Sequence, residues 1–335
     1  MARCADNPPP AAAQPPAVPP AERPRRALVV QDTAPLCAGV ALAAGLLCDS
    51  PTLGAQGLEA ARPAVEARIR ASGAEMVGVY ARDLDRADSL LVGALERFHA
   101  ASMMKVPVMI QVFRDLDEGR LARGEGVPVV NTFPSLVDGS PYSLSEADDS
   151  DISLYGRVGG RATVRELAEL MITVSSNLAT NILIERVRPE RAQATAVSLG
   201  ADSIQVRRGV EDTKAYRAGL NNTTTARDLG VLFAAIAEGR AASAESCREM
   251  MSILERQRFN EGIPAGLAAG ARVAHKTGWF TGTHHDGGVV TTPTGGRYVL
   301  VVLTRGIPEE SASARLIADL ARTVDAAVAA SRARR

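Results

Sequence analysis

The chain has 335 residues, of which 46% are hydrophobic, and its 38 basic and 38 acidic residues give a formal net charge of +0. This length fits one large domain or two small ones. A balanced charge gives no support to nucleic-acid binding, which relies on an excess of basic residues, so we expect no nucleic-acid partner.

The N-terminal region differs in composition from the rest of the chain. Residues 1–33 are rich in Pro, Ala and Arg and cannot bury enough apolar surface to fold. A short apolar run over residues 34–48 follows a group of arginines and precedes small residues, in the order typical of an export signal. We therefore expect residues 1–55 to be a disordered leader, and the chain to be periplasmic or secreted from a bacterium. The alternative is a disordered cytoplasmic extension, or a start codon placed too far upstream.

Strands are predicted near both ends of the remaining chain. Apolar alternation with β-branched and aromatic residues predicts strands at 76–81 and 89–98. The same signals return at 273–276, 288–292 and 298–304. The apolar run of the leader is too short for a membrane span, so we expect none in the mature chain.

The middle of the chain shows helical periodicity. Thr163 with Glu166 three residues later forms a capping box, which predicts a helix beginning there. Strands at both ends and helices between them predict an α+β fold. In it, an antiparallel sheet is flanked by N- and C-terminal helices, and an all-helical subdomain at about 121–224 is inserted into a catalytic domain of residues 56–335. The other predicted helices cover residues 102–118, 178–187, 225–238, 244–254 and 309–330.

Lysine is almost absent from this chain. Of the 38 basic residues only three are lysines, namely Lys105, Lys214 and Lys276. Arginine stays protonated in proteins, whereas a lysine that is buried near other cations can lose its proton. Each retained lysine is therefore a candidate for proton transfer.

Two of these lysines lie in short motifs. Ser102 and Lys105 are three residues apart at the start of a predicted helix, so the hydroxyl and the amine can share one face, where the amine could activate the serine as a nucleophile. Lys276 begins a Lys-Thr-Gly segment at the end of a predicted strand, which could present a cation and backbone N–H groups to a developing oxyanion. Taken alone, the first motif is common by chance and the second could be an ordinary surface strand end.

A third polar segment, Ser175-Ser176-Asn177, lies between two predicted helices. Capping of the second helix by Ser175 or Ser176 is the simplest interpretation of this segment. The order of the three segments along the chain is much more specific than any one of them.

Together the segments resemble the S-x-x-K, S-D-N and K-T-G motifs of class A β-lactamases and related penicillin-recognising serine hydrolases, over roughly residues 60–330. The resemblance implies a hydrolase that opens β-lactam rings through an acyl-enzyme on Ser102, followed by attack of water. The alternative is a D-Ala-D-Ala peptidase, or another acyl-serine hydrolase of the same fold, with poor β-lactam turnover. We also expect a small-molecule substrate, a monomer and no cofactor.

Roles for individual residues follow from this resemblance. Lys105 would exchange a proton with Ser102, and Ser175 would pass a proton to the leaving nitrogen. Glu211 would activate the hydrolytic water. The substrate-binding residues implied are Asn177, Lys276, Thr277, Gly278 and Trp279, with the backbone N–H groups of Ser102 and Trp279 as the oxyanion hole.

The chain departs from the family pattern at three places. Ser176 replaces the aspartate of S-D-N, and Ala215 stands four residues after Glu211 where the family has asparagine. The cation expected on the strand after K-T-G is missing, and Arg305 is a candidate to replace it. Glu211 could instead only form surface ion pairs with neighbouring basic residues.

Two further hypotheses concern polar groups near these motifs. Lys214 could lie beside Glu211 and favour its ionised form. The segment 284–286, His-His-Asp, could bind a metal, but adjacent strand residues point to opposite faces, and the cysteines lack the spacing of a zinc site. We therefore predict no metal site.

Overall fold

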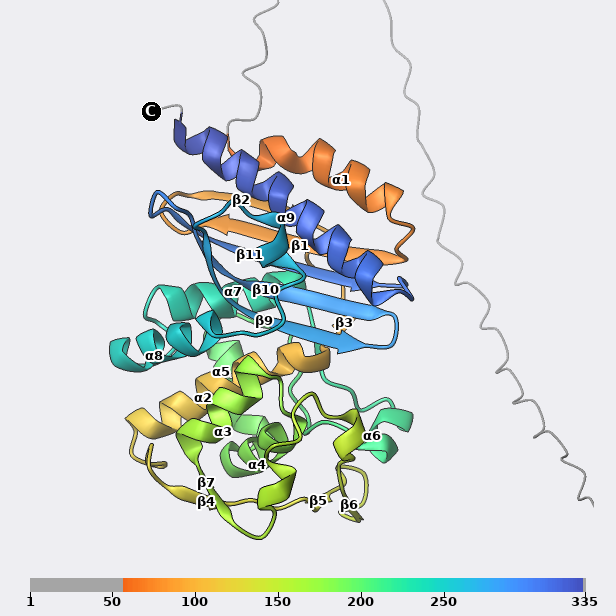
Figure 1. The fold of residues 1–335 in the computed structure, drawn as a ribbon, viewed down its shortest axis with the longest axis vertical. Coiled ribbons are helices and arrows are strands. Elements are labelled where there is room, and N and C mark those ends of the chain that lie inside the picture. Colours follow the sequence, from red (N-terminus) through yellow and green to blue (C-terminus); the bar gives the residue numbers. More distant parts are fainter. Residues whose placement is uncertain (1–56, 334–335) are drawn as a thin grey trace, which may run out of the picture. The chain divides into compact units, whose positions relative to one another are not determined.

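The computed structural model describes residues 57–333, so the predicted leader lies outside the described residues. A five-stranded antiparallel sheet forms the centre of this part, with strand order β2-β1-β11-β10-β9 (Figure 1). β1 pairs with β11 along its whole length, so the two ends of the described chain meet inside the sheet. The strands are β1 (Met76–Asp83), β2 (Asp88–Val92), β9 (Arg272–Phe280), β10 (Thr283–Thr291) and β11 (Arg297–Arg305).

Helices cover both faces of the sheet. α1 (Arg62–Ala71) and α9 (Glu310–Ala333) lie on one face, and α7 (Ala226–Ala237) and α8 (Ala244–Glu255) lie on the other (Figure 1). A hydrophobic core lies on each face of the sheet. Successive residues of a strand point to opposite faces, so β11 contributes to both cores and its sequence is a continuous apolar run. The α+β fold expected from the sequence is confirmed.

The remaining helices pack together beside the sheet (Figure 1). α2 follows directly on a single 3₁₀ turn at Ala101–Met104, and the short α6 lies in the loop after Glu211. The helices are α2 (Lys105–Asp117), α3 (Val164–Thr173), α4 (Asn177–Val187), α5 (Pro189–Ser198) and α6 (Thr213–Arg217). Short strand pairs complete the fold: β3 (Phe98–His99) with β8 (Thr223–Thr224), β4 (Gly126–Pro128) with β7 (Arg161–Thr163), and β5 (Phe133–Pro134) with β6 (Pro141–Tyr142).

Local sequence signals explain several element boundaries. The Thr163 hydroxyl accepts a hydrogen bond from the Glu166 N–H at 3.1 Å, as the capping box predicts. The single strand predicted at 89–98 is wrong, because the chain turns at Gly93, where φ is +54°. It forms β2 and β3 instead.

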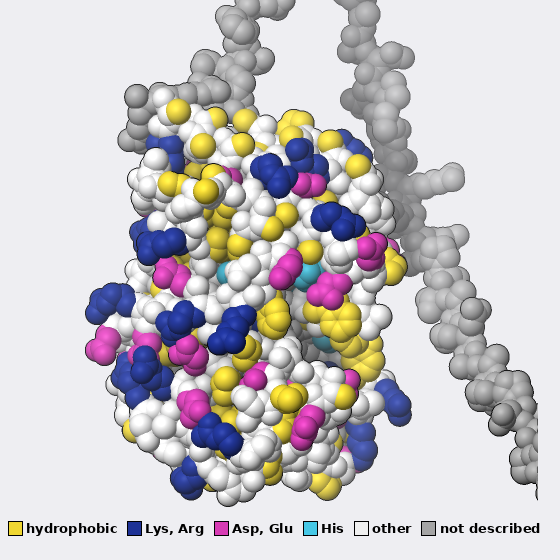
Figure 2. Space-filling model, viewed as in Figure 1, with side chains coloured by type: hydrophobic (Ala, Val, Ile, Leu, Met, Phe, Trp, Pro, Cys, Tyr) yellow, Lys and Arg dark blue, Asp and Glu magenta, His cyan; other side chains and the backbone are white. Residues whose placement is uncertain are grey.

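Charged side chains are spread over the face of the molecule shown in Figure 2, with no continuous basic patch. None of the helices in residues 57–333 is long and apolar enough to cross a membrane. Within the same residues, no group of three His, Cys, Asp or Glu side chains is placed to hold a metal ion.

Candidate active site

The folded chain brings the three motif segments together around the Ser175 hydroxyl. Lys105, the first residue of α2, donates hydrogen bonds from Nζ to the Ser175 carbonyl (2.6 Å), to Ser175 Oγ (3.1 Å) and to Asn177 Oδ1 (2.8 Å). Lys276, in the middle of β9, donates to the same Ser175 Oγ at 3.0 Å and to the Thr277 carbonyl at 2.8 Å. A helix start, a helix junction and a strand therefore converge on one oxygen atom.

Both lysine side chains are 0% exposed, and this burial governs their charge. Burial lowers the pKa of the Lys105 ammonium to about 7, although Asp149 and Glu211 act in the opposite direction. Burial, and secondly the nearby Lys105, hold the pKa of Lys276 well below its usual value. An amine at the position of Lys105 is therefore partly unprotonated near neutral pH and can accept a proton.

The predicted direct contact between Ser102 and Lys105 is not among the three hydrogen bonds of the amine. A direct contact would require one continuous helix over both residues, but Ser102 lies in the 3₁₀ turn and α2 begins only at Lys105. Ser102 faces the pocket, while the amine of Lys105 faces the α3–α4 junction. Ser175 is the residue that connects the two lysines.

Gly278 allows β9 to approach the turn that carries Ser102. A Cβ atom at Gly278 would lie 3.1 Å from the Ser102 backbone nitrogen and 3.2 Å from that of Met103. Only a residue without a side chain leaves this approach free. Trp279, whose backbone N–H is the second oxyanion donor that the family resemblance implies, is the next residue of β9 after Gly278.

Backbone strain is concentrated at the same place. Among the described residues, four non-glycine residues have positive φ, and three of them belong to the site or adjoin it. They are Ala101 (φ 45°), Ser175 (φ 58°) and Glu211 (φ 62°), and the fourth is Arg188. Such conformations cost free energy and persist where the surrounding structure enforces them, which is common at functional sites.

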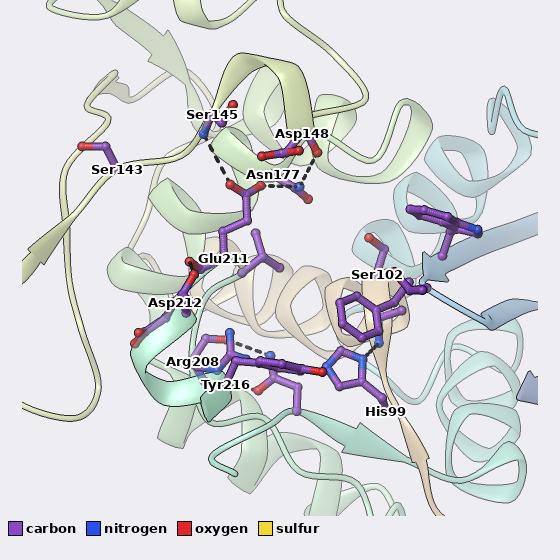
Figure 3. Close-up of a pocket in the computed structure, with 17 residues that line it drawn as sticks. His99, Ser102, Ser143, Ser145, Asp148, Asn177, Arg208, Glu211, Asp212 and Tyr216 are labelled. Carbon is purple, nitrogen blue, oxygen red and sulfur yellow. Dashed lines mark hydrogen bonds between the residues drawn. The ribbon is translucent and has the colours of Figure 1, made fainter. Parts of the chain in front are cut away.

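Glu211 lies half-buried in the pocket wall and forms no ion pair with its basic neighbours in the sequence. Its carboxylate accepts hydrogen bonds from Asn177 Nδ2 at 2.8 Å and from the Ser145 backbone N–H at 3.4 Å (Figure 3). Burial raises the pKa of this carboxyl, and the bonds from Asn177 and Ser145 oppose the rise. The alternative that Glu211 only forms surface ion pairs is therefore wrong.

The hypothesis that Lys214 supports Glu211 is also wrong. The Lys214 amine donates to Asp138 Oδ2 at 3.0 Å and to the Ser140 hydroxyl at 2.5 Å, on the exposed surface. α6 begins at Thr213, after an N-cap at Asp212, so Lys214 lies on the helix and points away from the carboxylate before it.

Asn181, which the sequence reasoning missed, fixes the backbone directly before Glu211. Its Oδ1 accepts from the Val210 N–H at 2.7 Å, and its Nδ2 donates to the Val210 carbonyl at 3.1 Å. A Cβ atom at Gly209 would lie 2.3 Å from Asn181 Oδ1, so the glycine is needed for this approach. Because Asn181 comes four residues after Asn177, on the same face of α4, helical spacing was the available signal.

Arg305 does not supply the cation expected near K-T-G. It is an exposed end residue of β11 that pairs with Glu75 at 3.3 Å, outside the pocket. Arg208 is the one lysine or arginine among the pocket-lining residues, and its guanidinium donates to the Leu220 and Gly209 carbonyls and to Asn221 Oδ1. On β10 the residues paired with Thr277 and Gly278 are Asp286 and His285, and neither is a lysine or arginine.

Ser102 and Glu211 line the same pocket, whose cavity volume is ≈ 540 Å³ (Figure 3). Aromatic rings form one side of it. His99 stacks on Phe280 at 4.8 Å between ring centroids, and Tyr216 meets Phe280 edge-on at 5.6 Å. The pocket thus combines a serine, a carboxylate and an apolar wall, and Asn177 in its lining accepts from the buried Lys105 amine. This fold and this arrangement define a serine hydrolase of the β-lactamase type.

Comparison with known proteins gives the family. The family model described as "Beta-lactamase enzyme family" matches residues 60–328, and the chain belongs to this family. A β-lactamase of Streptomyces fradiae is 28% identical over 307 residues, which cover 89% of this chain and 94% of the relative. The solved β-lactamase of Sphaerobacter thermophilus is 30% identical, with a TM-score of 0.69, over 80% of this chain and 97% of that one. The solved structure of PBP-A is 29% identical, with a TM-score of 0.69, over 80% of this chain and 95% of that one.

Proposed function

We propose that this protein hydrolyses β-lactams through an acyl-enzyme on Ser102. The observation that carries the proposal is the convergence of Lys105 and Lys276 on Ser175 Oγ. Lys105 also donates to Asn177, which lines the pocket of Ser102 and Glu211. β-Lactam substrates fit the family to which the chain belongs. A PBP-A mutant has been solved as an acyl-enzyme complex with penicillin-G, and that protein is 30% identical to this chain.

In the acylation step, Ser102 Oγ attacks the carbonyl carbon of the lactam, and a C–O bond forms. The acceptor of the Ser102 proton is the unprotonated amine of Lys105, whose lowered pKa suits it to this role near neutral pH. The two groups are not hydrogen-bonded in the structure, so the transfer requires Ser102 and Lys105 to come together when the substrate binds. As the C–N bond breaks, Ser175 gives its proton to the lactam nitrogen and is reprotonated from the lysines to which it is bonded. The N–H groups of Ser102 and Trp279 stabilise the carbonyl oxygen.

Substrate binding falls to the residues around this centre. The family resemblance assigns the carboxylate of the substrate to Lys276 and Thr277. Arg208, the one lysine or arginine in the described pocket lining, already donates to two carbonyls and to Asn221. Asn177 offers its amide to the substrate side chain. The aromatic wall of His99, Tyr216 and Phe280 packs against apolar parts of that side chain.

Deacylation needs a base that activates water, and Glu211 is the candidate. The carboxylate takes a proton from water while the oxygen attacks the ester carbon, and the Ser102–acyl bond breaks. The proton then returns to Ser102 Oγ. The half-buried position and the bonds from Asn177 and Ser145 hold the carboxylate in the pocket that contains the ester.

The second candidate is a D-Ala-D-Ala peptidase of the same fold that deacylates β-lactams poorly. The specific observation in its favour is Ala215, in place of the asparagine that would help hold the hydrolytic water.

A chromogenic cephalosporin separates these candidates. Sustained turnover by the wild type, with loss of deacylation in Glu211→Gln and accumulation of a Ser102 adduct by intact mass, supports the hydrolase. A stable adduct on the wild type itself supports the peptidase. Absence of both turnover and adduct would contradict the proposed function. Export of the chain stays a prediction, which the N-terminus of the protein recovered from the culture medium or periplasm would test.

A further inference from the structure

Asp149 binds the start of α4, although it lies far from that helix in the sequence. Its Oδ1 and Oδ2 both accept from the Asn177 N–H at 2.9 Å, and Oδ2 also accepts from the Leu178 N–H at 2.9 Å. These are the first two N–H groups of the helix, which have no partner inside it. A carboxylate at this position is bonded to the backbone and also favoured by the helix dipole.

The N-cap residue of α4 binds only one of the free N–H groups at the start of the helix. Ser176 Oγ accepts from the Ala179 N–H at 3.3 Å, the third of the helix. Its hydroxyl carries no charge, and the Asn177 and Leu178 donors are left to Asp149. The carboxylate that the sequence lacks at position 176 is therefore supplied from a different loop.

Asn177, whose backbone N–H binds Asp149, connects the two candidate bases, Lys105 and Glu211. Asn177 Oδ1 accepts from Lys105 Nζ at 2.8 Å, and Asn177 Nδ2 donates to Glu211 Oε1 at 2.8 Å. A shift of the Asn177 backbone would therefore move both contacts at once. Asp149 is itself fixed by the Tyr155 hydroxyl, which donates to Oδ2 at 3.1 Å.

We propose that Asp149 is a positioning residue of the reaction, which holds Asn177 between Lys105 and Glu211. This inference rests on the proposed function for its kinetic consequences. Asp149 also acts through its charge, because it raises the pKa of both Lys105 and Glu211. Glu211 also acts on Lys105, and Asp148 acts on Glu211; Lys276 shares Ser175 Oγ with Lys105. None of these residues is altered in the test below.

The test uses Asp149→Asn, which keeps the volume of the side chain and removes its negative charge. Its kcat/KM for a chromogenic cephalosporin should fall about 10- to 100-fold, as expected for loss of charge-assisted bonds to two backbone groups. The pH–rate profile should move to lower pH, because the pKa values of both Lys105 and Glu211 fall without this charge. Asp151→Asn is the matched control: within the described residues its carboxylate accepts only from Ser153, and the change keeps the Asp151 backbone N–H that donates to Asp149 Oδ1. It should leave rate and profile unchanged.

A rescue variant separates positioning from general loss of structure. Asp149→Asn combined with Ser176→Asp returns a carboxylate to the N-cap of α4 and should recover at least about tenfold in rate. If Asp149→Asn melts below the assay temperature, the double variant carries the test alone. A folded double variant without recovered rate, or a single variant with the rate and profile of the wild type, overturns the proposal.

A substrate-free measurement keeps the inference distinct from the proposed function. The chain has three lysines, so ¹³C-labelled lysine gives three Cε signals, and the titration of Lys105 can be followed directly. Its midpoint should move to lower pH in Asp149→Asn and stay in place in Asp151→Asn. An unmoved midpoint would contradict the inference, whereas a wild type inert to cephalosporins would contradict only the proposed function.

Discussion

Lys105 and Lys276 donate hydrogen bonds to the same atom, Ser175 Oγ, at 3.1 and 3.0 Å. Two fully buried amines that share one hydroxyl cannot both stay charged without a large electrostatic cost. In the proposed mechanism, the Ser175 hydroxyl is therefore the carrier of a proton from the lysines to the leaving nitrogen. It stands in a left-handed backbone conformation that turns it toward both amines.

Ser175→Ala removes this carrier and should lower the acylation rate about 100-fold or more, the usual contribution of a positioned proton donor. Stopped-flow acylation with a chromogenic cephalosporin measures the effect. Ser203→Ala, outside the pocket, is the control and should acylate as the wild type does. Normal acylation by a folded Ser175→Ala protein would remove Ser175 from the mechanism.

The pH dependence of deacylation should report on Glu211. Burial raises the pKa of this carboxyl above its ordinary 4.5, and a general base must be ionised. The deacylation rate should therefore rise with pH through a midpoint above 4.5, measured from kcat under conditions where deacylation limits turnover. Glu211→Gln should lose this rise together with most of the rate. A midpoint below 4.5 in the wild type would show that the base is another group.

Asn181→Ala should slow deacylation more than acylation. The side chain holds Val210 through two hydrogen bonds, and Val210 precedes Glu211, whereas neither bond involves Ser102 or Lys105. We expect deacylation to fall about 10- to 100-fold and the free energy of unfolding to fall by about 1–3 kcal/mol, since the Val210 N–H loses its partner and the Val210 carbonyl keeps the bond from the Tyr142 hydroxyl. Single-turnover kinetics separates the two steps. Glu185→Gln, an exposed change on the same helix, is the control, and an equal fall in both steps would contradict this role.

The sequence was sufficient for the fold and for the residues that carry a motif. Alternating apolar residues predicted β1 and most of the length of β11, and the Thr163–Glu166 box predicted the start of α3. Ser102, Lys105 and Lys276 stood out through their spacing and through the rarity of lysine. These signals are local, so a single chain shows them directly.

The supporting residues could not be found in this way. Asp149 reaches α4 across a loop, and the loop geometry that brings it there has no period or motif. Lys214 illustrates the opposite error, because it is close to Glu211 in the sequence and is turned away from it by α6. Proximity in sequence does not fix side-chain direction when a helix begins between two residues.

The burial of Lys105 should also be visible in stability. The pKa of a free lysine is about 10.4, whereas that of Lys105 in the folded chain is about 7. As pH falls from about 10 to about 7, the unfolded chain binds a proton that the folded chain does not, so the free energy of unfolding decreases. Below about 7 both states are protonated and the loss is complete. Methionine at position 105 does not bind a proton in either state. As pH falls from about 10 to about 7, the free energy of unfolding of Lys105→Met should therefore rise relative to that of the wild type, by at most about 4 kcal/mol.

Denaturant unfolding at several pH values between 6 and 10 measures this difference. The absolute stability of Lys105→Met includes the lost bonds to Ser175 and Asn177, but those losses do not depend on pH in this range. Lys105 also lowers the pKa of Lys276, so the Lys276 pKa should rise in Lys105→Met. This change also stabilises the variant relative to the wild type as pH falls. Lys214→Met is the matched control, because that lysine lies on the exposed surface, where it pairs with Asp138. Parallel curves for the two lysine variants would show that the Lys105 amine keeps its proton in the folded protein, and Lys105 could then not serve as the base for Ser102.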